Sequence, residues 1–528
     1  MSLEHDRAAT AHAKRDIARS ENRRRLASVG FVALAVGGLL AASAVFEAAP
    51  LQNAERSLGG RLPEASLQSN TASQWDCPGP LPAGSSPQRS AVLLTNPGTA
   101  PASVVVAAVA TSTATSSAGQ KLPGWSKTLV LPPRSSRELP LPTRGPSQDD
   151  AVSVLSASAA VAVFESVVYA PKSNPVPAAS PCEAGTASAS YIGAGSTFGS
   201  SSVIVSVFDP TATPAVVGIR VSTGAESVLP PTLQGLIIKP YSLKVFNLGR
   251  WVVQQPTLGV TVSVSVGRVA VGAAETEAPN ARVSGSGLLI AVDQTAGVWV
   301  MPPGVIRAGR SVAVRIFDPG VRSAMVTISS PLAGRAPIEL TDNLAAGGVL
   351  DVSLPLRASA TKKGKASSPA AAGAPAVEGP IVVRTRPREI SSADGVGVVV
   401  SRITALPYAG QDQAATFAAA TSVPSRQWVL PAATGVFGKS GLREDLVLSN
   451  PNNAAASAEV EVLRAGSGAV STIAIPANST ATVAVGSSRG HVLGAVLVLA
   501  SASVTAEAEI FASHGAFRPS PVEGVPIT

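Results

Sequence analysis

Residues 486–490 carry the clearest match to a catalytic motif in this chain of 528 residues. The segment Gly486-Ser487-Ser488-Arg489-Gly490 fits the nucleophile elbow G-x-S-x-G, and Glu507, Glu509 and His514 follow in the order acid, acid, histidine. A working elbow joins a strand to a helix at the top of an α/β sheet, whereas this segment lies between two β-forming runs. We therefore interpret Ser488 as a loop residue and predict that the protein is not an enzyme.

Histidine is too scarce for a conventional metal or cofactor site. The four histidines are His5, His12, His491 and His514, and the sequence contains no HExxH, CxxC or Walker motif. We therefore predict no metal and no cofactor.

Cys77 and Cys182 are the two cysteines of the chain. An even number of cysteines outside the cytoplasm indicates a disulfide, and two isolated cysteines without a partnered histidine make a poor metal site. The bond would join the two ends of one module. Closing a loop of roughly a hundred residues contributes about 4–5 kcal/mol in the chain-entropy model.

Two tryptophans are candidates for stacking on a sugar ring. Trp125 follows Pro123-Gly124, and Trp251 follows Gly249-Arg250. The other three tryptophans occupy equivalent places in a repeat, so we predict that they belong to the core. Two tryptophans in different modules do not by themselves make a site.

A low-complexity insert holds the remaining candidate ligand-binding residues. Residues 358–380 are rich in Ala, Pro, Gly, Ser and Lys and cannot bury enough apolar surface to order themselves, so we predict a disordered loop. Lys362, Lys363 and Lys365 either keep this loop soluble or attract an anionic wall polymer or lipid headgroups.

Positive charge is concentrated in two segments. The formal net charge is +8, and residues 1–25 and Arg357–Glu389 carry excesses of three and five positive charges, so the remainder is nearly neutral. No basic face with interleaved aromatic residues is left for nucleic acid, and we exclude that partner.

Short strands that end at a proline corner recur through the chain. An alternating apolar run stops at Asn-Pro or Asp-Pro four times, at Asn96, Asp209, Asp318 and Asn450. Period-two alternation predicts a strand with one buried face, proline has no N–H for the ladder, and Asn or Asp can close an Asx turn. With 47 Gly, 43 Pro and only 14% charged residues, the sequence predicts an all-β fold.

The corners belong to a repeat of about 110 residues. An aromatic residue precedes each corner, at Trp75, Tyr191, Trp299 and Trp428. The repeat length and strand rhythm predict a tandem array of four immunoglobulin-like β-sandwich modules. A propeller or another closed β assembly is the alternative. The predicted modules span residues 73–186, 187–296, 297–424 and 425–528.

The N-terminal region predicts a membrane anchor. Leu26–Phe46 contains no charged residue, and Glu47 follows it. A helix of this length spans the roughly 30 Å hydrocarbon core. Arg23-Arg24-Arg25 precedes it, which predicts a cytoplasmic tail at residues 1–25 and an extracytoplasmic remainder. Residues 47–72 are expected to form a stalk. The alternative is a signal peptide cleaved near Ala42-Ser43-Ala44.

The arginine-flanked span, the opening Trp75-Asp76-Cys77-Pro78 and the repeated corners resemble an actinobacterial family of single-pass membrane proteins with an extracytoplasmic all-β region, a domain of unknown function. The resemblance covers most of the chain after about residue 30. It implies no activity and supplies no functional residues.

We therefore expect a single-pass plasma-membrane protein that acts as a structural or interaction module of the cell envelope, without catalysis. The alternative is a protein that binds cell-wall glycan or anionic polymer. Its partner would be an envelope protein or a wall polymer.

Overall fold

A computed structural model describes most of the chain after residue 72, and every structural statement below concerns the described residues. These are residues 73–79, 87–110, 125–141, 150–156, 161–169, 176–193, 195–224, 226–278, 280, 283–304, 310–332, 335–354, 379–387, 396–408, 412–421, 423–431, 442–463, 470–487, 495–512 and 520–527. Within them no helix is long and apolar enough to cross a membrane. The predicted span Leu26–Phe46, tail and stalk lie outside the described residues.

The described chain is all-β, as predicted, with two short 3-10 helices, η1 (Pro231–Leu233) and η2 (Leu248–Arg250). We group the strands into four units in chain order. Unit 1 contains β1 (Ser73–Cys77), β2 (Pro87–Asn96), β3 (Ala102–Ala110), β4 (Trp125–Leu131), β5 (Ser135–Pro140), β6 (Asp150–Ser156), β7 (Ala162–Tyr169) and β8 (Val176–Pro181). Unit 2 contains β9 (Ala189–Ile192), β10 (Ser202–Asp209), β11 (Ala215–Ser222), β12 (Ser227–Val228), β13 (Leu236–Ile238), β14 (Ser242–Asn247), β15 (Gly259–Val266), β16 (Ala270–Glu277) and β17 (Val283–Ile290).

The second half of the chain repeats this series. Unit 3 contains β18 (Val298–Met301), β19 (Ser311–Phe317), β20 (Ala324–Leu332), β21 (Arg335–Leu344), β22 (Val349–Leu354), β23 (Ile381–Pro387), β24 (Val399–Tyr408) and β25 (Asp412–Ala419). Unit 4 contains β26 (Ser425–Pro431), β27 (Leu442–Asn450), β28 (Ala456–Leu463), β29 (Val470–Ile475), β30 (Ser479–Ser487), β31 (Ala495–Ala512), β32 (Ser520–Glu523) and β33 (Val525–Pro526).

Each unit has the same strand order in two sheets. In unit 1, sheet A has the order β1-β6-β3-β4 and sheet B the order β5-β2-β7-β8. Unit 3 repeats this as β18-β23-β20-β21 and β22-β19-β24-β25. In unit 4 the long strand β31 serves both sheets, pairing with β26 and β28 through its first half and with β27 through its second. A parallel pair, β17 with β25, joins the B sheets of units 2 and 3 into one eight-stranded sheet.

The four proline corners lie at equivalent places, at the end of the second strand of each unit. The predicted Asx turns are present in all four. The side-chain Oδ1 of Asn96, Asp209, Asp318 and Asn450 accepts a hydrogen bond from the backbone N–H two residues later, over 3.0, 2.8, 2.7 and 3.0 Å. Because proline follows each of these residues, the strand ends there and the chain turns toward the third strand.

A left-handed turn accompanies each corner and precedes the strand that pairs with the corner strand, which is β5, β14, β22 or β30. Arg134, Tyr241, Gly347 and Asn478 all have positive φ, of 51°, 49°, 68° and 51°. Glycine adopts this conformation without strain, whereas the other residues do so at some cost. Positive φ recurs at this position in all four units, which indicates that the corner and the turn form a single local motif.

The core lies between sheets A and B of each unit. In unit 1, Val104 of sheet A and Val92 of sheet B belong to one buried cluster with Trp75. Trp299 and Trp428 are buried at the equivalent positions in units 3 and 4, so the prediction that these three tryptophans belong to the core is confirmed. Tyr191, the fourth aromatic of the repeat, is half-buried.

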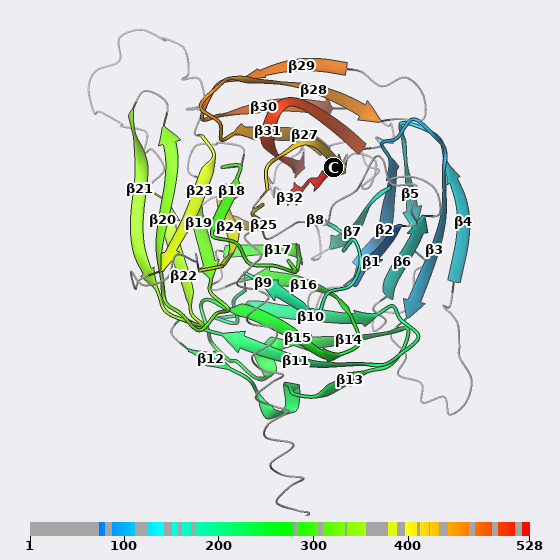
Figure 1. The fold of residues 1–528 in the computed structure, drawn as a ribbon, viewed down its shortest axis with the longest axis vertical. Helices are drawn as coiled ribbons and strands as arrows, with labels where there is room; N and C mark the ends of the chain where they lie inside the picture. Colours follow the sequence, from blue (N-terminus) through cyan, green and yellow to red (C-terminus); the bar gives the residue numbers. More distant parts are fainter. Residues whose placement is uncertain are drawn as a thin grey trace, which may run out of the picture. The chain divides into compact units, whose positions relative to one another are not determined.

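The units also contact one another in a closed cycle (Figure 1). Units 1 and 2 share buried contacts among Ala151, Phe208, Leu243 and Ala270, and larger clusters continue from unit 2 into unit 3 and from unit 3 into unit 4. Residues of unit 4 also belong to the cluster around the unit 1 core. A tandem array does not by itself require the first and last units to meet, and here they do.

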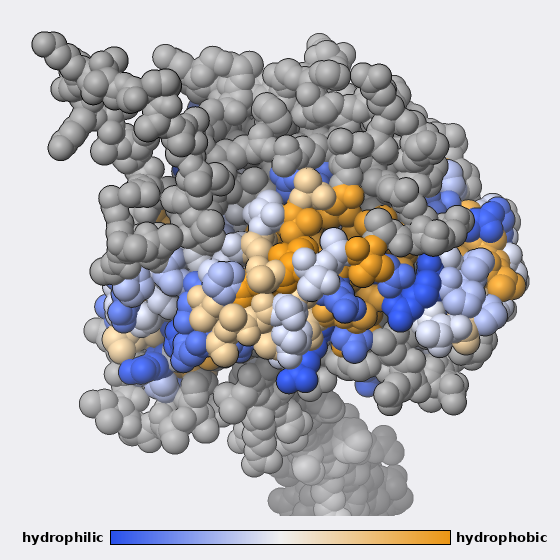
Figure 2. Space-filling model, turned by 90° about the horizontal axis from the view of Figure 1, so that it is seen from above, coloured by the Kyte–Doolittle hydropathy of each residue, from blue (hydrophilic) through white to orange (hydrophobic). Residues whose placement is uncertain are grey.

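Apolar side chains are exposed as well as buried. Figure 2 shows them gathered beside polar residues near the middle of the described surface seen from above. A chain with 14% charged residues has too few charged side chains to cover its outer strands, so such areas are expected.

Candidate functional site

The predicted disulfide is present. Cys77 at the end of β1 is bonded to Cys182 just after β8, with a Cα–Cα distance of 4.6 Å and a sequence separation of 105 residues. Reciprocal backbone hydrogen bonds between Asp76 and Glu183 flank the bond, over 2.8 and 2.9 Å. The bond therefore ties the first strand of unit 1 to the segment that leaves it.

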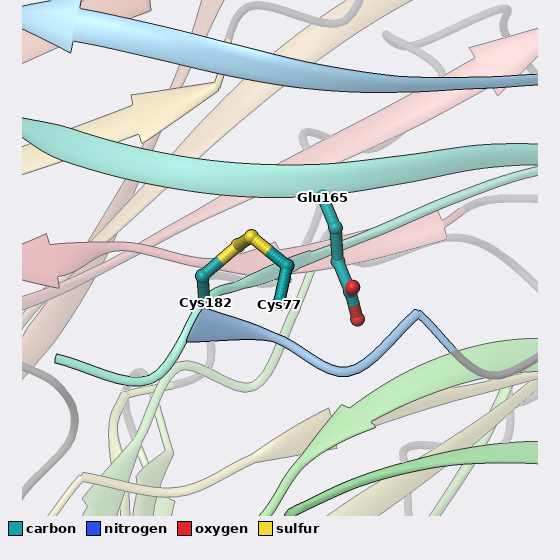
Figure 3. A group of neighbouring side chains, drawn as sticks. All are labelled: Cys77, Glu165 and Cys182. Carbon is teal, nitrogen blue, oxygen red and sulfur yellow. A yellow bond between two sulfur atoms is a disulfide. The ribbon is translucent and has the colours of Figure 1, made fainter. Parts of the chain in front are cut away.

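Three buried acids surround this disulfide. A carboxylate oxygen of Glu165 lies within 4.8 Å of both cysteine sulfurs (Figure 3). Burial raises the pKa of Asp76 to about 6, although hydrogen bonds from Ser153 and Gln74 oppose the shift. Burial also raises the pKa of Glu165 to about 7, and raises that of Glu183 well above its usual value.

Hydrogen bonds hold these acids in place. The backbone N–H of Gly79 donates to Glu165 Oε2 over 2.9 Å, and the N–H of Val271 donates to Glu183 Oε1 over 3.1 Å. Val271 belongs to β16, so Glu183 connects units 1 and 2. The spacing of Cys77, Cys182 and Glu165 resembles a set of metal ligands, but disulfide sulfurs are not the thiolates that bind metal. The group can hold protons and stabilise the junction.

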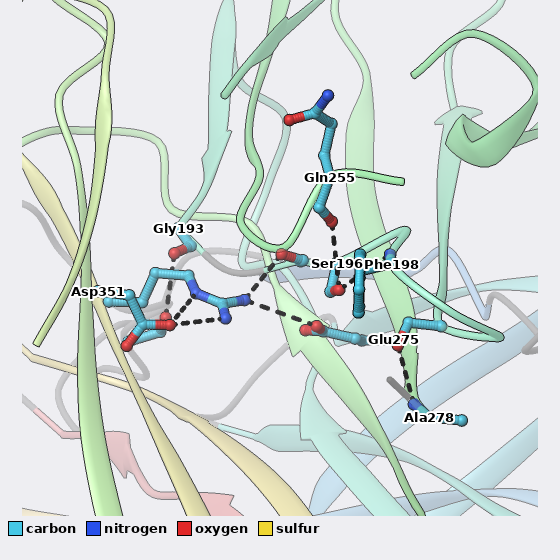
Figure 4. A network of polar contacts seen from close by, with 11 residues as sticks. Gly193, Ser196, Phe198, Gln255, Glu275, Ala278 and Asp351 are labelled. Carbon is cyan, nitrogen blue, oxygen red and sulfur yellow. Dashed lines mark hydrogen bonds and ion pairs between the residues drawn. The ribbon is translucent and has the colours of Figure 1, made fainter. Parts of the chain in front are cut away.

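A buried arginine network connects units 2 and 3 (Figure 4). Arg315 on β19 donates from Nη2 to Asp351 Oδ2 over 2.9 Å and from Nη1 to the carbonyl oxygen of Gly195 over 2.7 Å. Its Nη1 also lies 3.8 Å from Glu275 Oε1 on β16. Arg315 and Glu275 are almost completely buried, whereas Asp351 is exposed, so the network is shielded from solvent only on the Glu275 side.

A second buried network connects units 3 and 4. Arg402 on β24 donates from Nη1 to Glu507 Oε2 over 2.9 Å and from Nη2 to Glu507 Oε1, and also donates to the carbonyl oxygen of Pro302. Glu509 Oε1 lies 3.6 Å from Arg402 Nη2. Burial raises the pKa of Glu507 to about 7, and the positive charge of Arg402 opposes this shift.

Gly304 leaves the space that this second network occupies. A methyl group on Gly304 would lie 3.0 Å from both Arg402 Nη2 and Arg310 Nη2, and 2.2 Å from Glu509 Oε1. Two arginines and two glutamates therefore meet at one buried point, with formal charges that balance. Among the described residues all four side chains are buried, so their charges interact mainly with one another and not with solvent.

The candidate catalytic residues are only partly described. Ser488, His491, His514, His5 and His12 lie outside the described residues. Glu507 and Glu509, the acids that followed the serine in the motif, both point to Arg402. Neither Arg402, the partner of these two acids, nor Arg315, the arginine of the other network, was identified from the sequence. The available signal was an arginine within an apolar strand, as in Val314-Arg315-Ile316.

The two candidate tryptophans lie apart in the fold. Trp125 begins β4 in sheet A of unit 1 and packs, half-buried, on the core of that unit. Trp251 follows η2 in unit 2, donates from Nε1 to Thr232 Oγ1 over 2.8 Å and packs near Phe246, with ring centroids 6.5 Å apart. The structure does not bring them together. Lys362, Lys363 and Lys365, with the insert 358–380, lie outside the described residues except for Gly379 and Pro380.

A family model described as a family of unknown function (DUF5719) matches residues 176–423. This segment runs from β8 through units 2 and 3 and includes the Arg315 network. No curated protein matches the chain.

Proposed function

We propose that the protein is a structural or interaction module of the cell envelope, without catalysis, anchored in the plasma membrane by Leu26–Phe46. Its bulk, on this proposal, lies outside the cytoplasm and consists of four immunoglobulin-like sandwiches. The observation that carries the proposal is the position of the charged groups. Buried charged side chains contact the neighbouring unit at three junctions: Glu183 between units 1 and 2, Arg315 between units 2 and 3, and Arg402 between units 3 and 4.

The immunoglobulin-like part of this proposal concerns architecture more than strand order. Two facing sheets of short antiparallel strands, about a hundred residues per unit, support it. In an immunoglobulin constant domain the seventh strand pairs with the sixth. Here β7 pairs with β2 and β1 pairs with β6, so the strand order differs from that of an immunoglobulin constant domain.

Membrane fractionation with protease treatment of intact cells tests the anchored topology. We expect the full-length chain to sediment with membranes and to be cut from outside, leaving a short protected N-terminal fragment. A matched variant with two arginines placed inside Leu26–Phe46 should be released or fail to insert. A protein that resists protease in intact cells but is cut after lysis would contradict the proposed orientation.

Binding to an anionic wall polymer is the second candidate function. The observation that favours it is on sheet A of unit 3, where Arg384 and Arg386 of β23 are both exposed and, two residues apart, point to the same side. Exposed Val298 lies opposite Arg384 and exposed Met325 opposite Arg386, and Glu339 is an exposed acid farther along this face.

A sedimentation assay with purified cell-wall fractions tests this candidate. The detergent-solubilised full-length chain should be retained, and added salt should release it. Replacing Arg384 and Arg386 with glutamine should weaken retention if the sheet carries it, whereas deletion of residues 358–378 should weaken it if the insert does. Exposed Arg220→Gln on unit 2 is the matched control. Absence of retention by the unchanged protein would exclude this function.

A further inference from the structure

The four corner residues differ in one chemical respect. Units 1 and 4 use asparagine, Asn96 and Asn450, whereas units 2 and 3 use aspartate, Asp209 and Asp318. All four are fully buried, and all four accept the same backbone hydrogen bond at Oδ1. The second side-chain atom, Nδ2 in two units and Oδ2 in the others, therefore occupies an equivalent place.

In units 1 and 4, which have asparagine at the corner, the second side-chain atom is a hydrogen-bond donor. Asn96 Nδ2 donates to the carbonyl oxygens of Ala100, Leu131 and Pro132 over 2.8, 3.2 and 3.0 Å. Asn450 Nδ2 donates to three carbonyl oxygens at the same relative positions, those of Ala454, Ile475 and Pro476, over 2.8, 3.2 and 3.1 Å. The pocket is thus lined with acceptors.

The same pocket recurs in unit 3. In unit 1 the corner residue Asn96 lies opposite Ser135. In unit 3 Phe317, the residue before the corner Asp318, lies opposite Val349, so the corner itself aligns with the residue before Val349. Leu344 and Ala345 therefore occupy the positions of Leu131 and Pro132. Gly347 has the positive φ of Arg134 in the turn that follows. Asp318 Oδ2 is buried there without a hydrogen-bond partner. An ionised oxygen among carbonyl oxygens is unfavourable, whereas an O–H can donate to them.

We propose that Asp318 is a buried proton-binding site, held as a neutral carboxylic acid that donates its O–H where Asn96 and Asn450 donate an amide N–H. Loss of this proton leaves a carboxylate in a pocket of acceptors and loosens the corner of unit 3. The stability of this unit then depends on pH in a way that units 1 and 4 avoid by having asparagine.

The surroundings of Asp318 support this assignment. Burial raises its pKa to about 7, and the N–H of Gly320 lowers it. The ionisable residues of the neighbouring segments are Arg322, Asp342 and Glu226, which are exposed, and Arg315, whose guanidinium is bound to Asp351. The pKa of Asp318 is therefore raised by burial and not by the charge of a neighbouring residue.

Asp209 provides an internal contrast. Burial raises its pKa too, but hydrogen bonds from the Thr211 hydroxyl and backbone and from the Ala215 backbone oppose the shift. The Thr211 hydroxyl lies 2.7 Å from Oδ1, a contact that Gly320 cannot make in unit 3. We therefore infer that the proton is held more firmly at Asp318 than at Asp209.

The test compares the full-length protein in detergent with its Asp318→Asn variant between pH 4 and pH 9. Below about pH 4 Asp318 is protonated in both the folded and the unfolded state. Between about pH 4 and 7 the unfolded state loses the proton first, so the unfolding equilibrium constant of the wild type should rise up to tenfold per pH unit relative to the variant. The ratio should level off above about pH 7. Asp342→Asn, an exposed acid, is the matched control and should show a ratio that stays nearly constant.

Two further measurements separate protonation from mere packing. The infrared carbonyl band of protonated carboxyl groups at pH 6 should lose intensity in Asp318→Asn and keep it in Asp342→Asn. The Asn450→Asp variant should acquire the pH dependence of the unfolding equilibrium constant that Asp318→Asn loses. The Asp209→Asn variant should lose a smaller part of the pH dependence of the wild type than Asp318→Asn does. A wild-type-to-Asp318→Asn ratio that does not change with pH, an unchanged infrared band, or a pH-independent Asn450→Asp variant would overturn the proposal.

Discussion

Replacing Arg402 with methionine tests whether buried charge holds units 3 and 4 together. Arg402 is almost fully buried and contacts both carboxylate oxygens of Glu507. Methionine fills much of the same volume but leaves Glu507 buried without its bidentate partner. Breaking a buried ion pair in this way costs about 3–5 kcal/mol, so we expect the free energy of unfolding to fall by that amount at pH 8.

The loss should shrink at lower pH. Burial raises the pKa of Glu507 to about 7, and removing the arginine raises it further because a favourable positive charge is gone. At pH 5.5 Glu507 is then largely neutral in both proteins, and little buried charge is left unpaired. We expect the destabilisation at pH 5.5 to be smaller than at pH 8 by about 1–2 kcal/mol.

Denaturant unfolding of the full-length chain in detergent, followed by tryptophan fluorescence, measures this loss. Trp299 and Trp428 are buried in units 3 and 4, so they report on both sides of the junction. The exposed Arg384→Met is the matched control and should change stability by about 0.5 kcal/mol or less. The double variant Arg402→Met with Glu507→Leu should recover to within about 1 kcal/mol of the wild type. A single variant that loses less than about 1 kcal/mol at pH 8, or a double variant that loses the sum of both singles, would refute the reasoning.

Three other predictions concern the centre and the first junction of the assembly. Gly285→Ala would place a methyl group 2.0 Å from the carbonyl oxygen of Ala415, so β17 and β25 must separate and unfolding free energy should fall by about 3 kcal/mol or more. Gly224→Ala, with nothing within 4 Å of the new methyl, should change it by about 0.5 kcal/mol or less in the same assay. Replacing Cys77 and Cys182 with serine should cost about 3–5 kcal/mol, and dithiothreitol should shift the wild-type midpoint but not the variant's; an unmoved wild type would contradict this. The pKa of Asp76 and Glu165 is raised in the folded state to about 6 and about 7, so their stabilisation is complete below about pH 4 and is lost as pH rises through 7. Glu165→Gln should therefore flatten the decline in stability between pH 4 and 7, by about 3 kcal/mol at most, and an unchanged pH profile would count against it.

The local structure could be predicted because it depends on short-range chemistry. Proline after an alternating apolar run ended the strand at all four corners, and the Asn or Asp before it closed the expected turn. Trp75, Trp299 and Trp428 recur at equivalent places in the repeat, and all three are buried. The disulfide between Cys77 and Cys182 could be predicted without knowing the fold, because the chain has no other cysteine.

The junctions between units could not be predicted in this way. Arg402 and Glu507 are 105 residues apart, and no spacing along the chain connects an arginine of one unit with a glutamate of the next. The motif at Ser488 even suggested a different role for Glu507. The roles of these residues follow from how far each side chain is exposed and which residue it contacts. Both depend on how neighbouring sheets pack. The module boundaries, the anchor and the topology stay predictions.

The polar contacts differ from one junction to the next. Glu183 with the Val271 backbone joins units 1 and 2, Arg315 joins units 2 and 3, and Arg402 joins units 3 and 4. An apolar face would accept several neighbours, whereas a buried charge tolerates only the face that supplies its partner. We infer that these groups specify the order of assembly more than they add stability.

The junction of units 4 and 1 follows a different rule. Its ion pair, Arg134 with Glu461 over 3.3 Å, is partly exposed and contributes about 0–1 kcal/mol at most. Apolar residues of unit 4, among them Val525 and Ile527 near the end of the chain, join the unit 1 core cluster instead. Three junctions between consecutive units already fix where the fourth face must lie, so a specific charge pair is least needed there. Apolar burial is then sufficient to close the cycle.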